Sequence, residues 1–277
     1  MFKILSKEQL SPDVFRMDIE APLIAKKRKP GQFIILRVDE AGERIPLTIA
    51  DADAEKGTIT LIFQTVGTST LKLSRLNKDE SLLNFIGPLG KPTHIEKFNG
   101  SVVGIGGGIG IAPLHPIAQG MKSAGNKVIN IIGARSKNLL IMEEEMQNIS
   151  DELIITTDDG SYGKKGFVTD ALREIIQRGE KIDLVVAIGP AIMMMMVCKL
   201  TKEFGIKTLV SLNSIMVDGT GMCGACRVVV GGKTKFACVH GPEFDGHEID
   251  FDLLVKRQKT YLKEEKESKD KYLASIK

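Results

Sequence analysis

The alternation of apolar and polar residues gives the first third of the chain the character of a β-rich domain. From Phe2 to about Lys91, short β-prone runs such as GQFIILRV and GTITLIFQTV alternate with turn-forming clusters such as DADAEKG, and helical periodicity is scarce. This pattern is typical of a small antiparallel barrel. We therefore predict an antiparallel β-barrel domain over residues 1–97.

From Gly100 onward, apolar strands alternate with helical stretches. SVVGIG is followed by a glycine-rich loop, the helical APLHPIAQGMKSAG and a second strand, KVINIIGA, which together form a βαβ unit. The alternation continues through DELIITTDD, FVTDALREIIQRG and IDLVVAIGP to KTLVSLN. The pattern predicts a doubly wound α/β domain over residues 98–211.

The last quarter of the chain shows a different pattern. A segment rich in cysteine and glycine, residues 212–250, precedes a tail, residues 251–277, whose lysines and glutamates suit an exposed helix. A chain of 277 residues has room for two ordinary domains and a small appendage. We therefore predict a multidomain protein whose third part is a small subdomain with a helical tail.

Charge and hydropathy argue against two classes of protein, those that bind nucleic acid and those that enter a membrane. The 38 basic and 35 acidic residues are spread along the chain, so no basic surface for nucleic acid is indicated. No apolar run approaches the length that spans a bilayer, and the start, MFKILSKEQL, lacks the apolar core of a signal peptide. We expect a cytoplasmic protein that binds neither nucleic acid nor membrane.

The cysteine segment carries the most specific motif. In MVDGTGMCGACRVVVGGKTKFACVHGPEF, Asp218, Cys223, Cys226 and Cys238 are spaced as D-x4-C-x2-C-x11-C. Thiolates at x2 spacing bind one metal centre from a tight turn, and the glycines between them allow the loop to wrap around a cluster. Plant-type ferredoxin spacing begins C-x4-C-x2-C, with Asp218 here in the first position. These four residues are the predicted ligands of a [2Fe–2S] cluster.

Two alternatives for this segment stay open. It could hold a structural zinc ion, or Asp218 could be a turn residue while His240 or His247 supplies the fourth ligand. Cys198 stands apart on a predicted helix and is expected to be a buried small apolar residue, and His115 is expected to be structural.

A glycine-rich loop lies between the first strand and helix of the α/β domain. Glycines at a strand-to-helix turn let a pyrophosphate approach the backbone and meet the positive end of the helix dipole. The order is G-G-G-x-G-x-x-P rather than G-x-G-x-x-G, and a tight turn that binds nothing is the alternative. The candidate nucleotide-binding residues here are Gly106, Gly107, Gly108, Gly110 and Pro113.

Two later strand ends extend the candidate nucleotide site. Arg135 and Ser136 follow the second strand, where the adenosine ribose is bound in such sheets. Arg135 could accept a 2′-phosphate, stack or face solvent, so it does not decide between NADH and NADPH. Gly189 and Pro190 follow the strand IDLVVAI, in a place suited to the nicotinamide end of the cofactor.

The barrel contains a third group of candidates, in ERIPLTIAD and FQTVGTSTLKL. Arg44 and Thr48 could supply a cation and a hydroxyl to a flavin. Gly67, Ser69 and Thr70 open a predicted short helix and could form a pyrophosphate loop. Alone these are ordinary strand and turn residues, but their place upstream of a nucleotide-binding domain favours FAD.

The order of flavin barrel, nucleotide domain and C-terminal cysteine cluster resembles the ferredoxin–NADP reductase superfamily. Across essentially the whole chain, the sequence is similar to the electron-transfer subunits of dihydroorotate dehydrogenase. It is more similar to the small subunits of NADH-dependent reduced ferredoxin:NADP+ oxidoreductases. Both subfamilies share TTDDGSYGKKGFVTDAL and GPLGKP. Asp218, where the first subfamily has cysteine, and the charged extension from Lys256 to Lys277 favour the second.

The resemblance implies a set of cofactor contacts. The family's flavin motif is R-x-[YF]-[ST], and this chain departs from it, because Arg44 lies one residue early and Ile45 takes the arginine position. Asp158, Asp159 and Gly160 would lie near the nicotinamide. FAD would be bound through Pro46, Leu47, Thr48, Gly67, Ser69 and Thr70, and the nicotinamide nucleotide through the loop from Gly107 to Pro113.

The resemblance also implies a function. The chain would be an oxidoreductase subunit that exchanges a hydride with NAD(H), with NADP(H) as a possible substitute. It would pass single electrons through the cluster to a larger partner subunit that holds another flavin and [4Fe–4S] clusters and handles ferredoxin and NADP(H), in a heterodimer that performs electron bifurcation. Flavin chemistry performs the division of the electron pair, so no side-chain base is required.

Other functions stay open at this point. One is the electron-transfer subunit of an NAD-dependent dihydroorotate dehydrogenase in pyrimidine synthesis. Two others are non-catalytic: a module that senses redox state or nucleotide, and a scaffold stapled by zinc.

Overall fold

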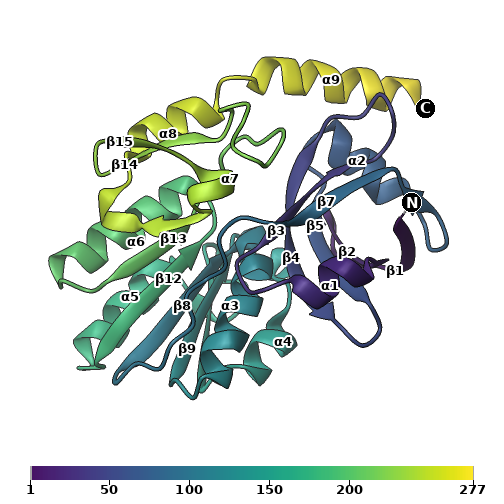
Figure 1. The fold of residues 1–277 in the computed structure, drawn as a ribbon. Helices are drawn as coiled ribbons and strands as arrows, with labels where there is room; N and C mark the ends of the chain where they lie inside the picture. Colours follow the sequence, from purple (N-terminus) through teal and green to yellow (C-terminus); the bar gives the residue numbers. More distant parts are fainter. Residues whose placement is uncertain (1, 277) are drawn as a thin grey trace.

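The computed structural model describes residues 2–276, and Figure 1 shows two sheets with a smaller C-terminal part beside them. The first sheet has the antiparallel order β6-β1-β2-β5-β4-β3-β7 and curls into a nearly closed barrel. Helix α1, Pro22–Lys27, and helix α2, Thr68–Arg75, lie in its connections. The strands are β1 Phe2–Ser11, β2 Val14–Glu20, β3 Phe33–Arg37, β4 Ile45–Asp53, β5 Thr58–Gln64, β6 Ser81–Leu82 and β7 Asn84–Leu89.

Strand β3 is apolar from Phe33 to Leu36 because both of its faces are covered. Side chains alternate between the two faces of a strand. Ile34 and Leu36 belong to the barrel core, whereas Phe33 and Ile35 belong to the core of the nucleotide and cysteine regions. The run FIILR therefore joins the barrel to the rest of the molecule.

The second sheet has the order β11-β10-β9-β8-β12-β13-β16. Its strands pair in parallel except β16, which is antiparallel to β13. Helices α3 Ile111–Ser123, α4 Glu143–Asn148, α5 Val168–Gln177 and α6 Ala191–Glu203 make the crossovers. The strands are β8 Ser101–Gly107, β9 Val128–Ala134, β10 Glu152–Thr157, β11 Lys164–Lys165, β12 Ile182–Ile188, β13 Thr208–Ser211 and β16 Glu243–Asp245.

The cysteine segment leaves the second sheet after β13 and returns to it as β16. Between them lie a hairpin, β14 Arg227–Val230 with β15 Lys233–Phe236, and the short helix α7, Ala237–His240. Two helices follow, α8 Phe251–Gln258 and α9 Leu262–Ser275. In Figure 1, α9 crosses back over the barrel above α2.

The architecture confirms the predicted fold class: an antiparallel barrel, a doubly wound α/β sheet and a small C-terminal part. The predicted helical tail is two helices, because α8 packs Phe251 and Leu254 into the core while α9 buries no residue. Met1 and Lys277, the outer ends of the predicted first and last segments, lie outside the described residues. Within residues 2–276, none of the helices combines the length and apolar character needed to cross a bilayer.

Candidate cofactor sites

The candidate nucleotide site lies where the strand order of the second sheet reverses direction. Strand β8 lies between β9 and β12. The sheet therefore continues through β9 and β10 on one side of β8 and through β12 and β13 on the other. In open α/β sheets, ligands bind in the crevice at the carboxyl ends of such strands. The glycine loop and Gly189 both lie at this edge, because Gly106 is paired with Ile188 in the parallel ladder.

Glycine is required at this edge by close packing. A Cβ built on Gly189 would lie 3.2 Å from the Cα of Gly107 and 2.8 Å from Met193 Cε. A Cβ on Gly110 would collide with the carbonyl oxygen of Ile188. Gly110 therefore lets the start of α3 approach β12, and Gly189 lets the end of β12 approach the end of β8.

The surroundings of the loop suit a phosphate group. Gly108 has φ +54°, and a Cβ there would meet nothing within 4 Å. The first turn of α3, which contains Pro113, carries no acidic side chain, so the positive end of its dipole is not neutralised. A nicotinamide nucleotide fits these residues.

The next two strands bring the other predicted nucleotide residues to the same edge. The N–H of Asp158 donates to Ala134 O at 3.1 Å, and the N–H of Asp159 donates to Arg135 O at 3.2 Å. The loop after β10 is thereby fastened to the loop after β9. Hydrogen bonds from Ser161 lower the pKa of Asp159, and Arg135 is exposed. Their contacts with a nucleotide stay a prediction.

The candidate flavin face is the outer face of β4. Ile45, Leu47 and Ile49 point into the barrel core, so Pro46 and Thr48 point outward. Because its side chain is in the barrel core, Leu47 would meet a cofactor only through its backbone. Arg44 lies before the strand and is exposed.

The first turn of α2 offers a second phosphate site. The N–H of Gly67 donates to Thr70 Oγ1 at 3.1 Å, and a Cβ on Gly67 would meet nothing within 4 Å. The first turn has no acidic side chain, and Ser69 and Thr70 are buried. The free amides of a helix start and the open space over Gly67 fit the pyrophosphate of FAD.

Two of the three predicted cysteine ligands converge. Cys226 and Cys238 are buried free thiols whose sulfur atoms lie 3.2 Å apart. Burial, followed by the hydrogen bond with Cys226, raises the pKa of Cys238 to about 12. Metal binding requires the thiolate and releases this proton. Cys223 is exposed at the rim of the same loop.

Asp218 organises the loop that carries Cys223. Its Oδ2 accepts from the N–H groups of Met222 at 3.2 Å and Cys223 at 3.0 Å, and its Oδ1 accepts from the N–H of Thr220 at 3.1 Å. Burial opposes ionisation, but the hydrogen bonds from Thr220 and Cys223 outweigh it and lower the pKa of Asp218. The carboxylate is thus ionised and adjacent to the cysteine loop.

The described residues do not include a compact group of three carboxylate, thiol or imidazole ligands around one point. A cluster with two irons distributes its ligands over a longer distance, and the cysteine pair with the glycine-rich loop fits that arrangement. The two histidine alternatives are engaged elsewhere. The Nδ1 of His240 accepts from Phe236 N–H at 3.0 Å, and the Nε2 of His247 lies 3.0 Å from Thr201 Oγ1 on α6.

The cysteine loop packs directly on the barrel. A Cβ built on Gly219 would lie 2.8 Å from Ile35 Cγ1 and 2.7 Å from Leu89 Cδ1. Ile35 is paired with Pro46 across strands β3 and β4, and Phe33 with Thr48. Sequence reasoning missed Phe33 and Ile35, although an apolar run without polar alternation indicates a strand covered on both faces. The candidate cluster loop therefore packs on β3, the strand that neighbours the candidate flavin strand β4.

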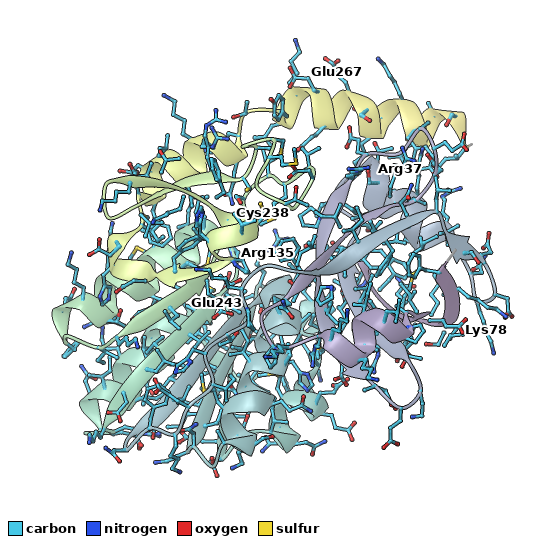
Figure 2. All side chains as sticks on the ribbon, viewed as in Figure 1. Arg37, Lys78, Arg135, Cys238, Glu243 and Glu267 are labelled. Carbon is cyan, nitrogen blue, oxygen red and sulfur yellow. The ribbon has the colours of Figure 1, made fainter. Side chains whose placement is uncertain are left out.

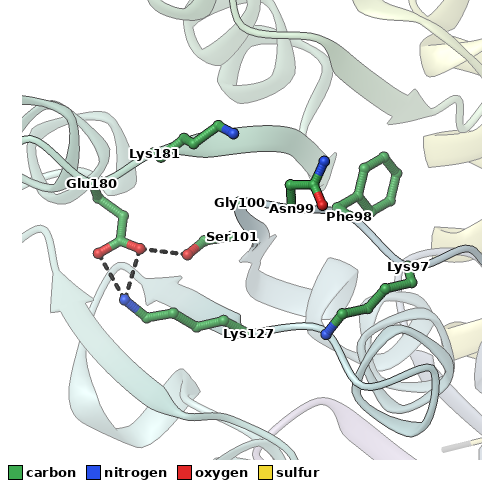
Figure 3. A pocket seen from close by; sticks show the side chains of 8 residues that line it. All are labelled: Lys97, Phe98, Asn99, Gly100, Ser101, Lys127, Glu180 and Lys181. Carbon is green, nitrogen blue, oxygen red and sulfur yellow. Dashed lines mark hydrogen bonds and ion pairs between the residues drawn. The ribbon is translucent and has the colours of Figure 1, made fainter.

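A separate hollow of about 330 Å³ lies at the opposite edge of the second sheet (Figure 3). It is formed around the amino ends of β8 and β9 and the turn before β12. The Nζ of Lys127 is paired with both carboxylate oxygens of Glu180 at 2.7 and 2.8 Å, and this hydrogen-bonded pair lowers the pKa of Glu180. Ligands of such sheets bind at the carboxyl edge, so the candidate sites lie elsewhere.

Two segments of the chain match known families. Residues 213–250 match the iron-sulfur cluster binding domain of dihydroorotate dehydrogenase B. Residues 105–199 match the oxidoreductase NAD-binding domain. The first match favours iron–sulfur over zinc at the cysteine segment, and both agree with the positions of the candidate sites.

Whole-length relatives extend these matches. The chain is 48% identical to the dihydroorotate dehydrogenase B (NAD(+)) electron transfer subunit homolog of Thermotoga maritima, covering 98% of this chain and 95% of that protein. It is 31% identical to the electron transfer subunit of this enzyme from Desulforamulus reducens, covering 89% and 96%. A structure from an NADH-dependent reduced ferredoxin-NADP oxidoreductase superposes with a TM-score of 0.93 at 48% identity, covering 99% and 98%.

Proposed function

The chain belongs to the family of dihydroorotate dehydrogenase B electron-transfer subunits and their homologues, and on this basis we propose that it is a redox subunit carrying FAD and a [2Fe–2S] cluster. It exchanges a hydride with NAD(H) and delivers electrons to a partner protein. The observation that carries the proposal is the packing of Gly219 on Ile35, which joins the candidate cluster loop to the strand pair that presents Thr48.

Each part of the chain has a defined role in this proposal. The amides after Gly107 and at the start of α3 hold the nucleotide pyrophosphate. The outer face of β4 and the first turn of α2 hold FAD, which when bound converts an electron pair into single electrons. Phe33 and Ile35 keep water out of the contact between the flavin face and the cluster loop. Cys223, Cys226, Cys238 and Asp218 are the proposed cluster ligands.

The proposed assembly is that of a ferredoxin:NADP+ oxidoreductase, in which a larger flavin and [4Fe–4S] subunit in the cytoplasm receives the electrons. The similarity over the full chain to the ferredoxin-NADP oxidoreductase structure, and the lower identity of 31% to the Desulforamulus reducens subunit, support this choice. The second candidate is a dihydroorotate dehydrogenase subunit, supported by the names of both relatives.

Cofactor analysis tests the proposal. The chain is expressed and purified without oxygen, and its flavin, iron, acid-labile sulfide and zinc are measured. We expect about two irons and two sulfides for each FAD and little zinc, with the flavin bleached by NADH. A colourless zinc protein would refute the proposal. Bound cofactors with no NADH-driven reduction of an artificial acceptor would support a non-catalytic sensor instead.

The partner is identified by co-purification from the source cell. A partner that contains flavin and [4Fe–4S] clusters and reduces NADP+ supports the first assembly. A partner that oxidises dihydroorotate supports the second.

A further inference from the structure

Helix α9 is held to the barrel although its composition suits solvent. Its sequence, LKEEKESKDKYLAS, is mostly charged, and the described helix buries no residue. A helix of 14 residues with this composition is marginal by itself, because propagation barely offsets the cost of nucleation. Its position therefore depends on what it contacts.

The contacting face is a narrow stripe. Within α9 and the residue that follows it, the half-buried positions are Lys269, Tyr272, Leu273 and Ile276, which recur at the spacing of one helical face. Figure 2 shows Glu267 on another face, pointing away from the barrel. The helix thus has one docking face and one solvent face.

This docking face meets both ends of α2. At the start of α2, Ser268 Oγ lies 2.9 Å from Thr68 Oγ1, and Lys269 Nζ donates to Val66 O at 3.3 Å. At the end of α2, the ring of Tyr272 lies under the cationic groups of Lys72 and Arg75, at 5.8 and 5.9 Å.

The residues at the start of α2 flank the candidate pyrophosphate loop. Val66 and Thr68 are the two neighbours of Gly67, over which the space is open. Lys269 makes one long hydrogen bond to a neutral carbonyl there, although an ammonium group has more donors than this bond uses. A phosphate at the same turn would offer this ammonium group an anionic acceptor, so that both partners of the hydrogen bond are charged.

We propose that α9 completes the FAD site from outside the barrel, with Lys269 as a ligand of the pyrophosphate and Ser268 and Tyr272 as positioning residues that hold α9 on α2. This inference rests on the proposed binding of FAD by the barrel. Since α9 follows α8, which packs on the nucleotide domain and hairpin, the helix fastens the cluster part of the molecule to the flavin part across the outside.

The test compares two single-charge variants of the full chain. The flavin is removed, and the dissociation constant for added FAD is measured by fluorescence quenching for wild type, Lys269→Gln and Lys271→Gln. Lys271 is exposed on the opposite side of α9 and is the matched control. We expect Lys269→Gln to weaken FAD binding about tenfold, the effect of one hydrogen bond to a charged group. The difference in FAD affinity between wild type and Lys269→Gln should be smaller at high salt, because salt screens the charge of Lys269.

Equal FAD affinity of the two variants and wild type would overturn the proposal. A wild-type chain that binds no FAD would instead refute the proposed function, so the two failures are distinguishable. Hydrogen exchange provides a second readout that does not depend on a substitution. FAD should slow amide exchange in residues 262–275, and unchanged exchange on FAD binding would contradict the role of α9.

Discussion

The nucleotide sheet and the cysteine segment are stabilised in different ways. Every residue of β8 and of β9 is buried, and their apolar side chains determine where the strands lie. In residues 213–250, the hairpin strands β14 and β15 are short and bury only Val228, and glycines at positive φ make the turns. The sheet strands are therefore stabilised by burial along their whole length, whereas the cysteine segment buries only some of its residues and also depends on its proposed ligands and on its attachment to the sheet.

Removal of one proposed cluster ligand should produce the largest difference between the two regions. Cys226→Ser should abolish iron binding, because Cys226 and Cys238 form the converging thiol pair. Hydrogen exchange should then accelerate in residues 213–250 and stay slow in β8 and β9. The measurements are iron content and exchange mass spectrometry.

The matched control is Cys198→Ser. Cys198 is buried in α6, where burial raises its pKa to about 12, and it is not a proposed ligand. This variant should retain iron. Retention of the cluster in Cys226→Ser would contradict the ligand assignment.

A single methyl group should damage the nucleotide region selectively. In Gly110→Ala, the new Cβ meets the backbone oxygen of Ile188, so α3 must shift away from β12. Overpacking of this kind costs about 1–3 kcal/mol of the free energy of unfolding. NADH affinity should fall at least about tenfold, since the shift moves the amides at the helix start. Calorimetry and NADH titration measure both effects.

Ser123→Ala, at the exposed end of the same helix, is the control and should change neither quantity. Iron content should be unchanged in Gly110→Ala. If Gly110→Ala loses both iron and NADH binding, the two regions are not independent.

The seam between the two regions should respond to pH. Glu243 on β16 accepts a hydrogen bond from Thr93 Oγ1 at 2.5 Å, and burial raises its pKa to about 7 from 4.5, against the lowering effect of Thr93. The protonated form is favoured in the folded state. The Glu243 carboxyl therefore stabilises the folded state fully below about pH 4.5, and this stabilisation is lost as pH rises through about 7. The free energy of unfolding should change by at most about 3 kcal/mol over this range.

Glu243→Gln should flatten the dependence of the free energy of unfolding on pH between those values, as measured by urea titration at several pH values. Glu203→Gln, an exposed control on the last turn of α6, should retain the wild-type profile. A wild-type profile in Glu243→Gln would mean that the carboxyl at the seam does not titrate in this range.

The smallest expected effect concerns the attachment of the cysteine segment through α8. Asp250 Oδ1 accepts from the N–H of Leu253 at 2.9 Å and caps this helix. Asp250→Ala should cost about 1 kcal/mol of the free energy of unfolding, the usual value of an N-cap. Asp250→Asn should restore it, because asparagine caps equally well. If urea unfolding shows the same loss for Asn as for Ala, the effect does not come from the cap.

The sequence was sufficient for the elements that burial determines. Alternation and periodicity predicted the barrel, the βαβ units and the glycine loop, because strands such as β8 and β9 are buried throughout and mostly apolar. The spacing of the cysteines predicted the cluster segment, because ligand spacing is a local property. In both cases the sequence pattern and the structural cause are within one short segment.

Long-range contacts were not predictable from local pattern. The return of the chain as β16 depends on three residues that pair with β13, too few to give a periodic signal. The contact of Gly219 with Ile35 and the docking of α9 on α2 join residues far apart in sequence. The hydrogen bonds of Asp218 to its own loop likewise require the folded turn. These contacts connect the predicted parts into one redox unit.

Electron exchange between the nicotinamide nucleotide and the cluster within one chain is the defining property of the proposed redox subunit. The oxidised protein is mixed anaerobically with NADH, and the dithionite-reduced protein with NAD+, while visible absorption and the electron paramagnetic signal of the cluster are recorded. We predict that the cluster changes oxidation state together with the flavin in at least one direction, and that Cys226→Ser retains only the flavin response. A flavin that responds to the nucleotide while the wild-type cluster stays unchanged in both directions would contradict the account.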